Sequence, residues 1–158
     1  MPESGYRALV AQQEKSWASS DRARNVMRGN RSRDTRPELA VRSAVHRLGL
    51  RFRVSARPLK HMRRSADLVF ASARVAVFVD GCFWHGCPEH YVPSVSNRNY
   101  WADKISLNRA RDSDTDRRLL EEGWLPLRIW AHEDPQRVAE MIAATVRART
   151  KKKELHSH

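Results

Sequence analysis

Four residues of the types that bind zinc lie in two places in the sequence. Cys82, Cys87 and His90 form a Cys-x4-Cys-x2-His cluster, and His132 follows later in the chain. Tetrahedral Zn²⁺ takes four nitrogen or sulfur ligands, often from one close cluster and one distant residue. Four protein ligands leave no coordination position open, so such a zinc would be structural. By itself the spacing favours this site no more than two buried thiols and two ordinary histidines.

Two aspartates could form a second, catalytic metal site. Asp67 begins one predicted strand and Asp80 ends the next, so antiparallel pairing would place them side by side. Paired carboxylates are hard oxygen ligands that suit Mg²⁺, which can activate water and shield charge on a phosphate. Glu38 could add a third carboxylate, although its place in a helix-capping motif explains it equally well. The alternative for both aspartates is an ordinary turn role at a strand end.

The loop after Asp80 carries a histidine and two large aromatic residues. His85 could take a proton from water near neutral pH, or it could be a further zinc ligand. Phe83 and Trp84 could form a small hydrophobic cluster. They could instead wedge between base pairs, and a mismatched step opens most easily.

The elements that must position these residues follow from hydrophobic periodicity and turn residues. A capping box at residues 35–38 opens a helix with an apolar face from Leu39 to Leu48, and Gly49 ends it. Three strands, a long helix with Leu120 on its apolar side, a further strand and a last helix follow. We expect these elements at residues 51–54, 67–71, 75–80, 100–122, 124–130 and 135–149. This order predicts an α/β domain with a mixed sheet.

The charge of the chain favours a polyanionic partner. Its net charge is +12, and the first 64 residues hold 16 Lys and Arg against 5 Asp and Glu. Such a one-sided excess, mostly Arg, is typical of nucleic-acid binding. The longest apolar run is short and the N-terminus lacks an apolar signal core, so we expect no membrane span and a cytoplasmic location.

The motifs resemble those of one enzyme family. The segment VFVDGCFWHGCPEH at residues 77–90 closely resembles the signature of the very-short-patch-repair (Vsr) endonucleases. Residues 24–28 and 34–39 resemble the N-terminal segment of that family. The C-terminal half of the family is matched by Tyr100, Trp101, Lys104, Ile105, Asn108, Arg111, Asp112, Gly123, Trp124, residues 128–130 and His132. The resemblance covers roughly residues 21–134.

The resemblance implies a restriction-endonuclease-like fold: a mixed central sheet flanked by helices, with a structural zinc. It implies a Mg²⁺-dependent endonuclease that nicks duplex DNA 5′ to the T of a T·G mismatch, which arises when 5-methylcytosine deaminates. That nick starts very short patch repair. We expect a monomer that acts on mismatched double-stranded DNA in the bacterial cytosol or nucleoid, with other mismatch-repair proteins as possible partners.

The resemblance also assigns catalytic roles residue by residue. Asp67 corresponds to the Mg²⁺-binding aspartate, and Val79 to a residue whose backbone carbonyl contacts the metal. His85 corresponds to the catalytic histidine, and Glu38 to a helix acid linked to metal-bound water. Asp80 stands beside the site, where the family accepts His or Asp.

Two further groups follow from the same correspondence. The structural zinc ligands are Cys82, Cys87, His90 and His132, and the side chains that wedge into DNA are Met27, Phe83 and Trp84. The chain departs from the family pattern at Ala66, where Pro is common, and at Ala131, where Glu often precedes the last zinc ligand. We expect a polar arm at residues 1–20, the endonuclease domain at residues 21–149 and a basic tail at residues 150–158.

Two rival functions remain open at this point. One is a related Mg²⁺-dependent nuclease that acts on other DNA lesions or structures. The other is a non-catalytic zinc module that binds DNA through the Arg-rich half. A zinc nucleobase deaminase is excluded, because it needs His-x-Glu and a later Pro-Cys-x-x-Cys, and neither pattern occurs.

Overall fold

The computed structural model describes residues 34–82, 86–90 and 95–157. Four residues with roles in the sequence analysis, Met27, Phe83, Trp84 and His85, lie outside these ranges. Among the helices that the structure describes, none combines the length and the apolar character needed to cross a membrane.

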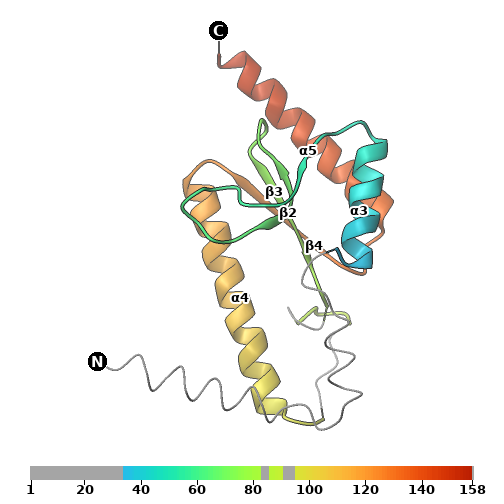
Figure 1. The fold of residues 1–158 in the computed structure, drawn as a ribbon, viewed down its shortest axis with the longest axis vertical. Coiled ribbons are helices and arrows are strands. Elements are labelled where there is room, and N and C mark those ends of the chain that lie inside the picture. Colours follow the sequence, from blue (N-terminus) through green and yellow to red (C-terminus); the bar gives the residue numbers. More distant parts are fainter. Residues whose placement is uncertain (1–33, 83–85, 91–94, 158) are drawn as a thin grey trace, which may run out of the picture. The chain divides into compact units, whose positions relative to one another are not determined.

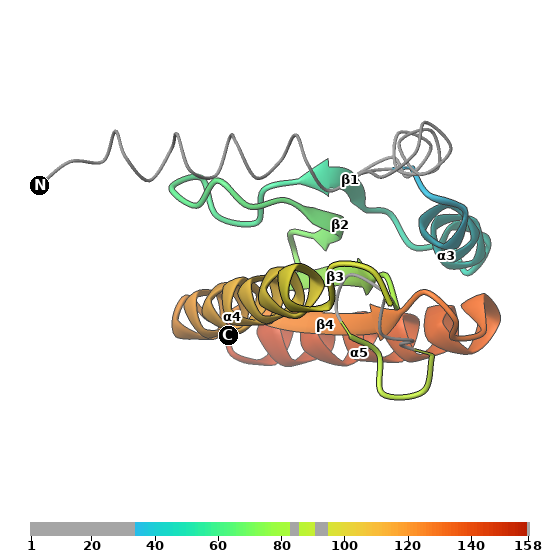
Figure 2. The same ribbon diagram turned by 90° about the horizontal axis from the view of Figure 1, so that it is seen from below.

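Three helices and four strands make up the described part of the chain (Figure 1). In chain order they are α3 (Arg36–Arg47), β1 (Arg53–Ala56), β2 (Ala66–Phe70), β3 (Val75–Asp80), α4 (Arg98–Glu121), β4 (Leu125–Trp130) and α5 (Pro135–Leu155). The strands form one sheet in the order β1-β2-β3-β4, as Figure 2 shows. The first two pairings are antiparallel, and β3 pairs with β4 in parallel through the crossover helix α4.

Apolar side chains cover both faces of the sheet. Helices α3 and α5 pack against one face, in a core that includes Val45, Leu68, Val77 and Ile142, each fully buried. Helix α4 covers the other face, where Leu119 packs in a second cluster with side chains of β2 and β3 (Figure 1). Because successive residues of a strand point to opposite faces, the last residue of β3, Asp80, shares the α4 side with the buried residues at positions 76 and 78.

The predicted α/β fold with a mixed sheet flanked by helices is confirmed, and it agrees with the restriction-endonuclease-like fold that the resemblance implies. β3 has the predicted bounds, whereas β1 lies two residues later than expected. Two residues predicted on apolar helix faces, Leu39 and Leu120, are instead exposed. α3 and α4 are amphipathic, but the buried face of each helix includes fewer apolar residues than the sequence pattern predicts.

The predicted end of the last helix is wrong. We expect it near Arg149 from the sequence, but α5 continues through the Lys-rich segment to Leu155. Lys is a good helix former, and Lys152 and Lys153 lie in the last turn, where the helix dipole favours positive charge.

Candidate active site and metal centre

The four predicted zinc ligands meet where two parallel strands end side by side. β3 leads through Gly81 into Cys82, and β4 leads through Ala131 into His132. The Ala131 N–H donates to the Asp80 carbonyl at 2.9 Å, which continues the pairing past the strand ends and brings His132 beside Cys82. The Cys87 N–H donates to the Cys82 carbonyl at 2.9 Å, which places the two cysteines side by side.

The donor atoms of Cys82, Cys87, His90 and His132 all lie within 4.8 Å of one another. The sulfur atoms of Cys82 and Cys87 lie 3.2 and 3.6 Å from His132 Nδ1, and Cys87 Sγ lies 3.8 Å from His90 Nδ1. In a zinc tetrahedron with Zn–S and Zn–N bonds of about 2.3 and 2.0 Å, a sulfur–nitrogen edge measures about 3.5 Å. The structure therefore brings these four residues together as expected, and their donor types and spacing fit zinc.

Neighbouring groups hold this cluster in place. His132 presents Nδ1 to the thiols, and its Nε2 lies 3.5 Å from Glu89 Oε2, the kind of contact that orients a metal-binding imidazole. Arg109 Nη2, on α4, donates to the Gly86 carbonyl at 2.6 Å. Gly86 has a φ of +63°, a left-handed conformation that favours glycine at this turn.

Asp67 bridges β2 and β3 at the point where their pairing opens. The paired residues nearest this end are Leu68 and Val77. Beyond them, the Val79 N–H donates to Asp67 Oδ2 at 2.7 Å, in place of a backbone acceptor. The predicted antiparallel arrangement is confirmed, and it holds the Asp67 carboxylate beside the peptide of Val79, the residue whose carbonyl the resemblance assigns to the metal.

Burial is the main influence on the Asp67 carboxyl group, and it raises the pKa of this group from 3.8 to about 6. The Val79 N–H opposes this rise in pKa, as does the positive charge of Arg42. The negative charges of Glu38 and Asp80 raise the pKa of Asp67 further, so two neighbouring acids act on this carboxyl group. No described residue donates a hydrogen bond to Asp67 Oδ1. A divalent cation at Asp67 would offset this unfavourable charge, and oxygen ligands of this kind suit Mg²⁺.

Glu38 is buried and held from two sides. Its Oε2 accepts a hydrogen bond from the Asp34 N–H at 2.8 Å and lies 3.3 Å from Arg42 Nη2. The predicted capping box is wrong in detail, because the Thr35 side chain makes no cap hydrogen bond and Glu38 reaches the N–H of Asp34 instead. Asp34 has a φ of +58°, which turns its N–H toward the helix. Glu38 thus both caps α3 and adds negative charge near Asp67.

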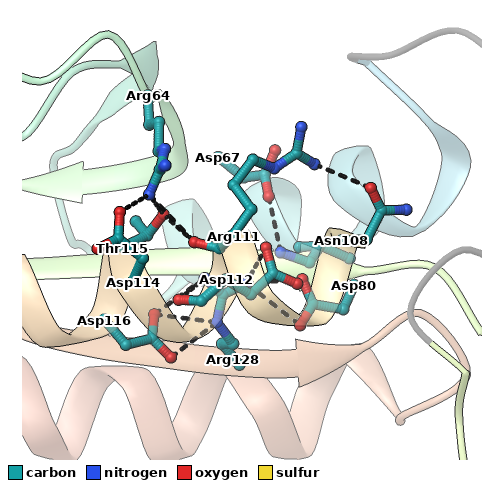
Figure 3. A network of polar contacts seen from close by, with 11 residues as sticks. Arg64, Asp67, Asp80, Asn108, Arg111, Asp112, Asp114, Thr115, Asp116 and Arg128 are labelled. Carbon is teal, nitrogen blue, oxygen red and sulfur yellow. Dashed lines mark hydrogen bonds and ion pairs between the residues drawn. The ribbon is translucent and has the colours of Figure 1, made fainter. Parts of the chain in front are cut away.

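Asp80 is 7% exposed and is paired with Arg128 of β4, whose Nη1 lies 3.1 Å from Asp80 Oδ1 (Figure 3). The same guanidinium contacts Asp112 and Asp116 of α4. Burial lowers the pKa of Arg128, but the hydrogen bond to Asp116 and the charges of Asp80 and Asp112 outweigh it, so the pKa is raised.

The role of this Arg128 cluster was not predicted from the sequence. Two signals were present: Arg128 is a lone charge in the otherwise apolar segment 124–130, and Asp112 and Asp116 are four residues apart, on one helix face. The proposed roles of His85, Phe83, Trp84 and Met27 concern residues outside the described ranges, so they remain predictions.

Comparisons with known proteins identify relatives of this chain. A sequence model of the family described as DNA mismatch endonuclease Vsr matches residues 16–90. The chain is 41% identical to the type II nicking enzyme V.NaeI of Lentzea aerocolonigenes, over 81% of the chain and 76% of the relative. It is 44% identical to the type II nicking enzyme V.XorIIP of Xanthomonas oryzae pv. oryzae, over 73% of the chain and 83% of the relative. It is 36% identical to the DNA mismatch endonuclease Vsr of Escherichia coli, over 66% of the chain and 65% of the relative.

Proposed function

Because the chain belongs to the Vsr family of DNA endonucleases, we propose that it nicks one strand of duplex DNA 5′ to the T of a T·G mismatch, with Mg²⁺ as catalytic cofactor and Zn²⁺ as structural metal. The nick would begin very short patch repair of deaminated 5-methylcytosine. Family membership argues against the non-catalytic zinc module that the sequence left open.

The observation that best supports a catalytic cation is the environment of Asp67. Its carboxylate is largely buried, lies among the negative charges of Glu38 and Asp80, and is fixed by the Val79 N–H. Asp67 and the Val79 carbonyl would hold Mg²⁺. When bound, this ion supplies positive charge for the phosphate in the transition state and acidifies a water molecule.

The residues of the chain have separate tasks in this proposal. Asp67 and Val79 fix the cation at the end of the β2–β3 pair, and Glu38 contributes negative charge beside it. His85 takes a proton from the attacking water. Because His85 follows Cys82 in the loop that carries the zinc ligands, a rigid zinc cluster would also hold the histidine in place.

Recognition of the mismatch is assigned to three apolar side chains. Met27, Phe83 and Trp84 would insert next to the mismatched pair, where stacking is weakest. Phe83 and Trp84 also lie in the zinc loop, so the same cluster that orients His85 would preorganise the wedge.

A panel of labelled duplexes tests the substrate. The panel contains T·G, the other mismatches and perfect pairs in one sequence, and each strand carries its own label. We expect Mg²⁺-dependent nicking of the T-containing strand of the T·G duplex, 5′ to the T. Equal nicking of all duplexes would favour the related nuclease that acts on other DNA structures, and would reject mismatch specificity.

A further inference from the structure

Arg128 makes a complete set of contacts within the described structure. Its Nε and Nη2 donate to Asp116 at 2.9 to 3.0 Å. Its Nη1 faces Asp80 at 3.1 Å and Asp112 Oδ1 at 3.4 Å, and Nη2 also reaches the Asp112 carbonyl at 3.3 Å. A guanidinium has five N–H donors in a rigid plane, and these contacts engage all three of its nitrogen atoms. The group also lies over the Phe78 ring, 4.4 Å from its centre.

The strands and the helix direct these contacts toward the candidate active site. Arg128 lies opposite Phe78 in the β3–β4 register, two residues before the position opposite Asp80. Both side chains point to the α4 side of the sheet, where Asp112 and Asp116 lie one helical turn apart (Figure 3). Arg128 therefore joins β4 and α4 to the carboxylate at the end of β3.

Among the described residues of this cluster, acidic side chains outnumber basic ones. Three carboxylates face one guanidinium, and Asp80 also acts electrostatically on Asp67. Without Arg128, the carboxylates of Asp80, Asp112 and Asp116 would share one partly buried space with no positive partner from β4. Such a group of oxygen ligands attracts divalent cations.

We infer that Arg128 is a positioning residue that holds the Asp80 carboxylate on its Nη1, so that the catalytic cation binds at Asp67 and not between Asp80 and the acids of α4. This inference rests on the proposed function, because it concerns the same cation. It also gives Asp80 a role: Asp80 is an ion-paired group that shapes the charge around Asp67.

Two properties should change in opposite directions when Arg128 is replaced. In Arg128→Met, the released carboxylates should bind divalent cations more tightly than the wild-type site, by at least about threefold. The rate constant for nicking should fall about 10- to 100-fold, the size of loss seen when residues around a metal site are replaced, because the cation would be drawn from Asp67 to the released carboxylates. The KM for DNA should stay within about threefold, because Arg128 makes no contact with the substrate in this proposal.

Arg64 provides a matched control. It also ties α4 to the rest of the fold, because its Nη1 lies 2.9 Å from Asp114 Oδ2, 2.7 Å from Thr115 Oγ1 and 3.1 Å from the Arg111 carbonyl. Arg64 and Arg128 thus contact the same helix. The side-chain contacts of Arg64 are with Asp114 and Thr115, whereas Arg128 also contacts Asp80 (Figure 3). Arg64→Met should lower the melting temperature while leaving the rate constant and the cation affinity within about twofold of wild type.

The experiment measures Mn²⁺ binding to the zinc-loaded proteins without DNA, by electron paramagnetic resonance, and single-turnover nicking of a T·G duplex. Wild type, Arg128→Met, Arg128→Lys and Arg64→Met are compared at matched zinc content. Arg128→Lys keeps the positive charge with fewer donors, so we expect intermediate values, and it serves in place of Arg128→Met if that variant does not fold. Wild-type Mn²⁺ affinity and nicking in both Arg128 variants would overturn the inference, as would equal losses in Arg64→Met. Failure of the wild type to nick would instead reject the proposed function, and the Mn²⁺ comparison would still decide the role of Arg128.

Discussion

Replacing Asp67 with asparagine should make the metal-free protein more stable near neutral pH. The folded protein raises the pKa of Asp67 from 3.8 to about 6, chiefly through burial. A group whose pKa is raised on folding favours the folded state at low pH, and this contribution is lost as the pH rises through the folded pKa. Between about pH 4 and pH 6, ionisation of Asp67 therefore increasingly destabilises the fold.

The size of the effect follows from the pKa shift. A shift of about two units corresponds to about 3 kcal/mol at about pH 7.5, where the penalty is fully developed, and to about half of that at about pH 5. An asparagine side chain has nearly the same shape as that of Asp67, and its amide oxygen can still accept from the Val79 N–H, so the substitution removes the charge and keeps the hydrogen bond. Asp67→Asn should therefore raise the free energy of unfolding by up to about 3 kcal/mol at about pH 7.5.

Urea denaturation at the two pH values, with zinc present and Mg²⁺ absent, measures this difference. Added Mg²⁺ should then stabilise the wild type, because it binds the folded state, and should leave Asp67→Asn unchanged. A variant that is equally or less stable than wild type at the higher pH would show that ionised Asp67 does not destabilise the fold. A stability gain of the same size at both pH values would show that the gain does not arise from the ionisation of Asp67.

Two further predictions concern the metals. The Mg²⁺ concentration for half-maximal nicking should rise as the pH falls through about 6, because a proton and the cation compete for Asp67. A half-maximal Mg²⁺ concentration that stays constant from about pH 7.5 to pH 5 would contradict this prediction. Cys87→Ser should reduce bound zinc well below one equivalent and lower the melting temperature, because Cys87 is fully buried within the four-residue cluster. Elemental analysis measures the zinc content, and thermal melting measures the stability. A variant with full zinc content would argue that the cluster binds no structural zinc.

The fold was largely predictable because β2, β3 and β4 are rich in apolar residues and are bounded by turns or a helix. The segment from Val75 to Asp80 is bounded by turn residues, so its limits could be read directly. The zinc grouping required more than spacing, since Cys82 and His132 come together only through the parallel β3–β4 pairing. The end of α5 was misplaced because a Lys-rich segment is compatible with both a tail and a helix.

The details of the acidic site depend on tertiary contacts that a sequence does not encode locally. A capping box predicts a bond between Glu38 and Thr35, but the positive φ of Asp34 redirects Glu38 to a different N–H. The pairing of Asp80 with Arg128 links two strands and a helix that are far apart in the chain. Sequence patterns mark such residues as unusual, but only the assembled sheet and helix show which of them form ion pairs.

We propose that a cation held by Asp67 drives strand-specific nicking at a T·G mismatch. The most direct test is nicking of a T·G duplex, labelled separately on each strand, by wild type and Asp67→Asn with and without Mg²⁺. We expect a nick 5′ to the T only for wild type with Mg²⁺, while both proteins bind the mismatched duplex. Nicking by Asp67→Asn at the wild-type rate, or nicking by the wild type in the absence of any divalent cation other than zinc, would contradict this proposal.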